Sequence, residues 1–193
     1  MVLHHVPQRA DPVIIGDASL QPYGFADGDL DMIYGRRIPQ RLKQHIAETT
    51  SSGTVFINAS GNDGNDINRL PEWPAAFQLP GKITVASYNV QQYLSFWSNY
   101  GILVDLAAPG EKILSLVPPD PGQPEGQLCD KSGTSMATPF VAGVAALLLS
   151  AKPSLSPTAV SDAINSSVIS GAFGVRTHGK LNALHAAQWA LSH

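Results

Sequence analysis

The chain has 193 residues, of which 44% are hydrophobic and 14% charged, and its formal net charge is -3. Ordinary domains carry about 25% charged residues, so this composition predicts one compact domain, or a large piece of one, with an extensive core. Lys and Arg number 12 against 15 Asp and Glu, without a basic run, which argues against a nucleic-acid partner. The single cysteine excludes an intramolecular disulfide scaffold.

Short apolar runs bounded by Gly, Pro, Asn or Asp predict buried strands along the chain. These runs lie at residues 13–15, 54–57, 83–86, 102–104 and 113–116. A pattern with helical spacing occupies residues 38–49, between the first two runs. The order strand, helix, strand predicts a parallel crossover.

The longest apolar run, residues 140–149, is about half of the roughly 20 residues that a membrane span requires. It therefore predicts a buried helix, over residues 138–151 with Pro139 in the first turn, and no membrane partner. Further helices are expected near residues 158–167 and 182–191. The first 12 residues lack the cationic start and apolar stretch of a secretory signal, so either the protein is not exported from this start or the true start lies upstream.

A serine stands at the beginning of the apolar helix, in the segment Gly-Thr-Ser-Met-Ala-Thr-Pro of residues 133–139. The unpaired N–H groups of a helix start carry partial positive charge, so an oxyanion formed beside Ser135 would be stabilised, which suits acyl transfer. Alternatively, Ser135 or Thr134 only caps the helix. The nucleophile motif of α/β-hydrolases is excluded, because Ala137 replaces its second glycine.

An asparagine follows one of the predicted strands, in the segment Ser-Gly-Asn-Asp-Gly of residues 60–64. A strand that runs into this glycine-rich turn places the Asn62 amide at the carboxyl end of a parallel sheet, where open α/β folds hold their sites. Asparagine beside glycine is also ordinary turn chemistry, so this segment alone is a weak signal.

Together these segments resemble those of the subtilases, the subtilisin-like serine proteases. Residues 133–139 with Val-Ala-Gly at 141–143 match the segment of the nucleophilic serine, and residues 60–64 match that of the oxyanion asparagine. Residues 98–110 match the region that links them. The resemblance implies a three-layer α/β/α fold with a mostly parallel sheet. It makes residues 1–193 the carboxyl-terminal portion of a catalytic domain whose amino-terminal part is missing.

The resemblance also implies roles for individual residues. Ser135 is expected to attack the scissile carbonyl, while the Asn62 amide and the Ser135 backbone N–H hold the oxyanion. Thr134 is expected to support this oxyanion pocket. A polypeptide substrate is expected to lie between two short segments, namely Ser19, Leu20 and Gln21 on one side and Ala59, Ser60 and Gly61 on the other.

The resemblance does not extend to the base that a serine nucleophile needs, nor to the carboxylate that orients the base. The family carries these groups in Asp-Ser/Thr-Gly and His-Gly-Thr-His-Val-Ala-Gly, and neither motif occurs in this sequence. Asp17 lacks the glycine and lies only 45 residues before Asn62, which leaves no room for the helix of the His motif.

Three functional hypotheses remain open from the sequence. The first is a serine endopeptidase whose Asp and His lie upstream or on a separate amino-terminal half. The second is a catalytically dead pseudoprotease that binds peptides. The third is an unrelated hydrolase in which His178 or His185 lies about 3 Å from the Ser135 hydroxyl. Under the first two hypotheses the isolated chain is expected to be inactive.

Alternating carboxylates at residues 27–31 resemble the start of a calcium-binding loop, although the sixth position lacks glycine and Ile38 replaces the glutamate at the twelfth. Either this is a solvated acidic loop or it binds structural Ca²⁺, as subtilases often do. No other cofactor is expected. Family resemblance alone implies an extracellular location.

Overall fold

The computed structural model describes residues 13–16, 30–33, 36–117 and 127–192. They include a sheet with the strand order β1-β4-β5-β6-β10-β9, parallel throughout except for the antiparallel β10–β9 pair. The strands of this sheet are β1 (Val13–Gly16), β4 (Val55–Ala59), β5 (Lys82–Tyr88), β6 (Leu106–Pro109), β9 (Ile169–Ser170) and β10 (Gly179–Lys180).

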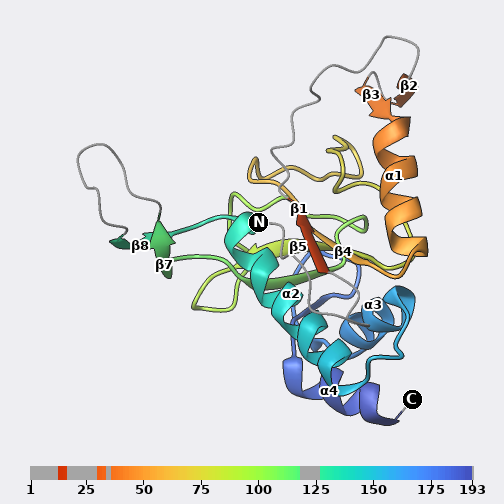
Figure 1. The fold of residues 1–193 in the computed structure, drawn as a ribbon. Helices are drawn as coiled ribbons and strands as arrows, with labels where there is room; N and C mark the ends of the chain where they lie inside the picture. The colour runs from red at the N-terminus through yellow and green to blue at the C-terminus, as the bar shows by residue number, and fades with distance from the viewer. Residues whose placement is uncertain (1–12, 17–29, 34–35, 118–126, 193) are drawn as a thin grey trace.

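Helices cover both faces of the sheet (Figure 1). In β4, Val55 and Ile57 pack toward the helices of one face, whereas Phe56 between them packs with Ile46 of α1 on the other, because successive strand residues point to opposite sides. The helices are α1 (Gln40–Ser51) on one face, and α2 (Thr134–Ala151), α3 (Pro157–Ser166) and α4 (Ala183–Ser192) on the other. The predicted three-layer α/β/α fold is confirmed.

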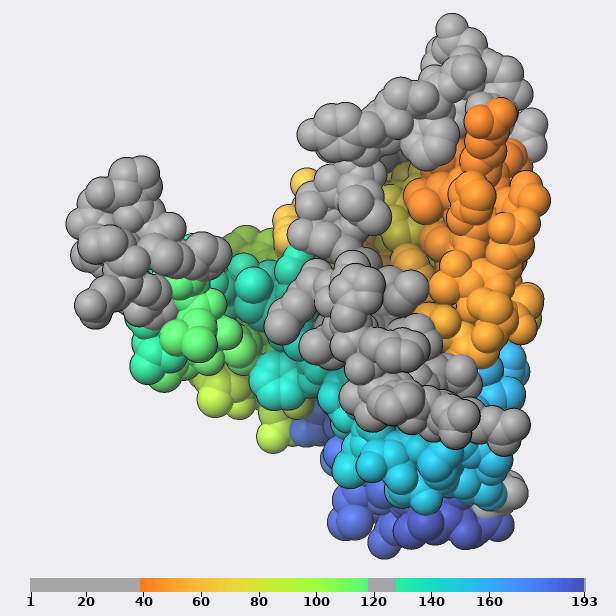
Figure 2. Space-filling model, viewed as in Figure 1, coloured from red at the N-terminus to blue at the C-terminus, as the bar shows by residue number. Residues whose placement is uncertain are grey.

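Two antiparallel hairpins stand outside the sheet, one formed by β2 (Leu30–Ile33) and β3 (Arg36–Pro39), the other by β7 (Ile113–Val117) and β8 (Gln127–Lys131). The β7–β8 hairpin projects from the body of the molecule in both the ribbon and the space-filling view (Figures 1 and 2). Two residues separate the end of β8 from the start of α2, so this hairpin leads directly into the predicted nucleophile helix.

Three of the predicted elements are wrong in detail. Residues 113–116 form a strand, β7, but it is not buried as predicted, since Leu114 is 62% and Leu116 75% exposed. Residues 102–104 form a turn, closed by a bond from the Val104 N–H to the Gly101 carbonyl at 3.0 Å, and the strand begins only at Leu106. Val104 is fully buried from this turn, so its apolar character reports burial and not strand geometry. Helix α2 begins at Thr134, not at residue 138, so Pro139 lies inside the helix and not in its first turn.

Helix α2 has the length and composition of a membrane span, with a mean hydropathy of 1.6, but half of it is buried inside the protein. Its inner face packs against β4, β5 and β6, as expected for a core helix. Its outer face is exposed, with Phe140 43% and Leu147 52% accessible. The predicted helix is therefore buried on one side only.

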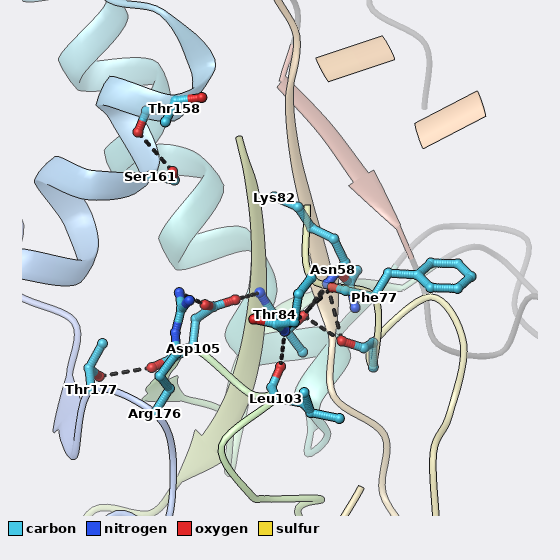
Figure 3. Close-up of polar contacts among 12 residues, drawn as sticks. Asn58, Phe77, Lys82, Thr84, Leu103, Asp105, Thr158, Ser161, Arg176 and Thr177 are labelled. Carbon is cyan, nitrogen blue, oxygen red and sulfur yellow. Dashed lines mark hydrogen bonds and ion pairs between the residues drawn. The ribbon is translucent and has the colours of Figure 1, made fainter. Parts of the chain in front are cut away.

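A buried polar cluster joins the amino ends of β5 and β6 (Figure 3). The Asp105 carboxylate accepts a hydrogen bond from the Thr84 N–H at 2.6 Å and pairs with the Arg176 guanidinium. The Lys82 ammonium donates to the Ala75 carbonyl at 3.1 Å and to the Thr84 hydroxyl. Burial lowers the pKa of Lys82 to about 8, although Asp105 opposes this, and burial raises the pKa of Asp105.

The lowered pKa of Lys82 makes the stability of the fold depend on pH. Between about pH 8 and 10.5 the folded chain has lost this proton while the unfolded chain keeps it, so stability rises with pH in this window. We expect the wild-type chain to gain up to about 1.4 kcal/mol per pH unit over a Lys82→Met variant there. Urea unfolding of both chains across this window measures the gain, and a constant difference between them would contradict the prediction.

Candidate active site

The buried side chain of Asn99 holds the turn that carries Asn62. The Asn99 amide nitrogen donates to the Ser60 carbonyl at 3.0 Å. Its amide oxygen accepts from the backbone N–H groups of Asp63, at 3.1 Å, and Asn65, at 2.9 Å. Asn99 therefore fixes the chain on both sides of Asn62. The family motif includes Asn99 in a matching segment but does not reveal this role.

Gly61 gives the turn its direction. Its φ angle of 106° lies in the left-handed region, which side chains other than glycine rarely adopt. A Cβ atom at this position would overlap the Asn99 amide and the Glu72 carboxylate. Glycine is thus required both for the backbone conformation and for the approach of Asn99.

The start of α2 lies against the end of β6. The Gly133 N–H donates to the Gly110 carbonyl at 2.9 Å, and a Cβ atom on Gly110 would lie 2.8 Å from the Gly133 carbonyl oxygen. Because Gly110 follows β6 and Asn62 follows β4, both lie at the edge of the sheet where its parallel strands end. This is the edge at which open α/β folds hold their sites.

Asn62 and the start of α2 are in direct contact. The Asn62 amide oxygen accepts hydrogen bonds from the Thr134 backbone N–H at 2.9 Å and from the Thr134 hydroxyl at 3.0 Å. The Thr134 hydroxyl in turn accepts from the Gly61 N–H at 3.3 Å. Because the oxygen of the amide faces Thr134, which directly precedes Ser135, the NH₂ group of Asn62 is turned away from these two donors.

The alternative in which Ser135 or Thr134 caps the helix is wrong. The N-cap is Gly133, which has no side chain, and Thr134 and Ser135 are the first two residues of α2. The Asn62 side chain satisfies the first N–H group of the helix from outside. Since the first turn contains no acidic side chain, the helix start keeps its partial positive charge for an anion beside Ser135.

The structure describes only one of the two predicted substrate-binding segments. Ser19, Leu20 and Gln21 lie outside the described residues. Ala59 and Ser60 are fully buried. The Ser60 N–H already donates to Val85, at 2.9 Å, and the Gly61 carbonyl accepts from the Asn99 N–H, at 3.0 Å. A substrate that lies along this segment therefore meets backbone groups that are already engaged within the chain.

The histidines of the third hypothesis are both exposed. His178 immediately precedes β10, which runs parallel to β6, so it lies at the edge where the parallel strands begin, opposite to Ser135. His185 lies in the first turn of α4 and His45 on α1. The remaining histidines, His4, His5 and His193, lie outside the described residues.

In the part of the chain that the structure describes, no cluster of side chains supports the predicted calcium site. There, no group of three or more His, Cys, Asp or Glu side chains comes together. Asp31 lies in β2 and pairs with Ile38 of β3, so this part of the predicted loop is an antiparallel hairpin. Asp27 and Asp29 lie outside the described residues.

Comparison with known proteins decides the family. The model of the subtilase family matches residues 32–187. The chain belongs to the subtilases. Thermitase of Thermoactinomyces vulgaris is 37% identical to it over 148 residues, which are 77% of this chain and 49% of thermitase. The major intracellular serine protease of Bacillus subtilis (strain 168) is 39% identical over 111 residues, which are 56% of this chain and 32% of that protein.

A solved structure shares the fold of this subtilase. A protease of Pseudoalteromonas arctica PAMC 21717 matches with a TM-score of 0.68 at 31% identity, covering 77% of this chain and 46% of that one. This subtilase therefore spans about half the length of thermitase and of the P. arctica protease. Because one relative is named an intracellular protease, family membership does not fix the cellular compartment.

Proposed function

We propose that residues 1–193 are the carboxyl-terminal portion of a subtilase catalytic domain that hydrolyses peptide bonds in polypeptides. In this proposal Ser135 is the nucleophile, and the Asn62 amide and the Ser135 backbone N–H hold the oxyanion. The observation that carries it is the pair of hydrogen bonds from Thr134 to the Asn62 amide oxygen, at 2.9 and 3.0 Å. They direct the NH₂ group away from Thr134 and free it for a developing negative charge.

The proposed reaction proceeds by acyl transfer. The Ser135 oxygen attacks the scissile carbonyl carbon while its proton passes to a histidine base, and the charge that develops on the carbonyl oxygen is held by Asn62 and the helix start. The base returns the proton to the leaving amine, and water then releases the acyl group from Ser135. Thr134 contributes by fixing the orientation of the Asn62 amide.

The base and its carboxylate are proposed to come from an amino-terminal half, encoded upstream or present as a separate chain. Two exposed features support a partner of this kind. Among the described strands, β1 pairs on one side only, with β4, and the outer face of α2 exposes Phe140 and Leu147. An added parallel strand would satisfy the free edge of β1. The extracellular location remains a prediction from the family resemblance.

A fluorophosphonate probe, which labels activated serines, tests this assignment. The purified chain alone is expected to stay unlabelled, because its sequence lacks the Asp and His motifs that supply the base in this family. Mixed with the amino-terminal half of a subtilase that carries the Asp and His motifs, the chain is expected to be labelled at Ser135. A Ser135→Ala variant should lose the label, whereas Ser132→Ala, which removes an exposed serine just before the helix, should keep it.

Two results would contradict the proposal. Labelling of the chain alone would mean that one of its own histidines activates Ser135, as in the third hypothesis. A complex that binds peptides and joins the amino-terminal half without any labelling would identify a pseudoprotease. The intact set of Ser135, Thr134 and Asn62 argues against that second outcome, because peptide binding alone does not require them.

A further inference from the structure

A cavity of about 290 Å³ lies at the edge of the sheet opposite to Ser135, where the parallel strands begin. Lys82, the first residue of β5, and Asp105, which directly precedes β6, line it together with Arg176 and one face of α3. Figure 3 shows these groups, with α3 above the Asp105–Arg176 pair. The function proposed for Ser135 uses none of them.

On the α3 side, the cavity is lined by the hydroxyl groups of Thr158 and Ser161 and by two residues with oxygen acceptors, Asp162 and Asn165. The Asn165 amide oxygen is buried and has no hydrogen-bond partner. Asp162 lies one helical turn earlier, on the same face of α3, and among the described residues no side chain pairs with its carboxylate. A buried acceptor without a partner, such as the Asn165 oxygen, is costly, and the exposed Asp162 carboxylate adds a negative charge beside it. This wall is therefore suited to a cationic group that donates several hydrogen bonds.

The opposite side of the cavity offers donors. Arg176 is 45% exposed, and one nitrogen of its guanidinium pairs with Asp105. A guanidinium carries five N–H donors in a planar fork, so Arg176 keeps donors for a second anionic group such as a carboxylate. The Arg176 donors and the acceptors of Asp162 and Asn165 thus line one cavity, although they come from different elements of the fold.

The charges that line the cavity balance. Lys82 and Arg176 are basic, and Asp105 and Asp162 are acidic. A ligand with net charge would leave an uncompensated charge in a partly enclosed site, whereas a neutral molecule that carries one positive and one negative group would not. Phe77, Leu79 and Pro80 add an apolar surface to the lining. Small-molecule sites span roughly 300–1,000 Å³, so this volume suits a small ligand.

We propose that this cavity binds a free α-amino acid with an apolar side chain, as its zwitterion. The ammonium group donates to Asp162 and Asn165, the carboxylate accepts from Arg176, and the side chain contacts Phe77 and Leu79. The proposal is independent of the function assigned to Ser135.

Calorimetric titration of the full chain with L-leucine tests the proposal. One equivalent is expected to bind. N-acetyl-L-leucine, which lacks the ammonium group, and L-leucinamide, which lacks the carboxylate, are each expected to bind at least about tenfold more weakly, because each loses a hydrogen bond between charged groups. Absence of L-leucine binding, or equal binding of L-leucinamide, would overturn the assignment.

Variants locate the ligand in the cavity. Asp162→Asn and Asn165→Ala are each expected to weaken L-leucine binding by about tenfold or more. Asp130→Asn, which neutralises an exposed carboxylate on β8, is the matched control and should leave binding unchanged. Ser135→Ala should also bind L-leucine normally. If Asp130→Asn weakens binding as much as Asp162→Asn, or if Ser135→Ala abolishes binding, the ligand does not occupy this cavity.

Discussion

An Asn99→Ala variant is expected to lose about 3–6 kcal/mol of unfolding free energy. The substitution leaves the Ser60 carbonyl and the N–H groups of Asp63 and Asn65 without their partner. Each buried polar group that loses its partner costs about 1–3 kcal/mol. Asn99 itself is fully buried, so the vacated space adds a further cost. Urea unfolding of the two chains measures the difference.

Asn89 provides the control for this substitution. Its amide oxygen accepts a hydrogen bond from the Tyr93 N–H at 3.0 Å in an exposed turn, where water can replace the lost partner. Asn89→Ala should therefore cost less than about 1 kcal/mol. A cost for Asn99→Ala as small as that of the control would mean that the turn around Asn62 holds its shape without Asn99.

The fold could be predicted from the sequence where a buried strand appears as an apolar run between turn residues. Strands β1, β4 and β5 were expected within a few residues, because a fully buried strand is an apolar run bounded by turn residues. The two-residue strands β9 and β10 were not expected, since neither lies in an apolar run. The failure at residues 102–104 has a local cause. Gly101 adopts a φ of 118° and starts a turn, and Val104 is buried without belonging to a strand. The apolar character of Val104 thus reflects its burial and does not identify the backbone geometry.

From the sequence, the candidate site could be predicted only as two separate segments, residues 60–64 and 133–139, and not as a set of contacts. The residues on either side of Asn62 and Ser135 indicate turn and helix chemistry, but the contact between Asn62 and Thr134 depends on how β4 and β6 end at one edge of the sheet. The capping of helix α2 also could not be predicted from neighbouring residues. Thr134 has a hydroxyl suited to capping, yet the capping group comes from Asn62, 72 residues earlier in the chain. Local sequence does not reveal such a partner.

The burial of the charged residues Lys82 and Asp105 could not be predicted from the sequence either. Lys82 precedes an apolar run, and a lysine in that place is usually exposed. Here its ammonium is held by the Ala75 carbonyl and the Thr84 hydroxyl, and Asp105 balances its charge from the next strand. The two edges of one sheet therefore carry different chemistry, with an uncharged amide and hydroxyl at one edge and paired charges at the other.

An Asn62→Ala variant, assayed together with an amino-terminal half that supplies the base, is expected to hydrolyse peptides far more slowly. Removing one oxyanion donor costs about 10²–10³ in kcat, a figure measured on subtilisin, itself a member of this family. KM should change little, because the donor acts mainly on the charge of the transition state. Steady-state hydrolysis of a peptide substrate measures both constants.

An Asn62→Asp variant separates the catalytic role of this side chain from its structural role. Its carboxylate can still accept from the Thr134 N–H and hydroxyl, as the amide oxygen does now at 2.9 and 3.0 Å, so the start of α2 stays in place. The NH₂ donor, however, is replaced by an oxygen that repels the developing anion. We therefore expect Asn62→Asp to be at least as slow as Asn62→Ala while unfolding at a higher urea concentration. If Asn62→Asp retained the wild-type rate, the amide would act only as a helix cap, and the oxyanion would have to be held by other groups.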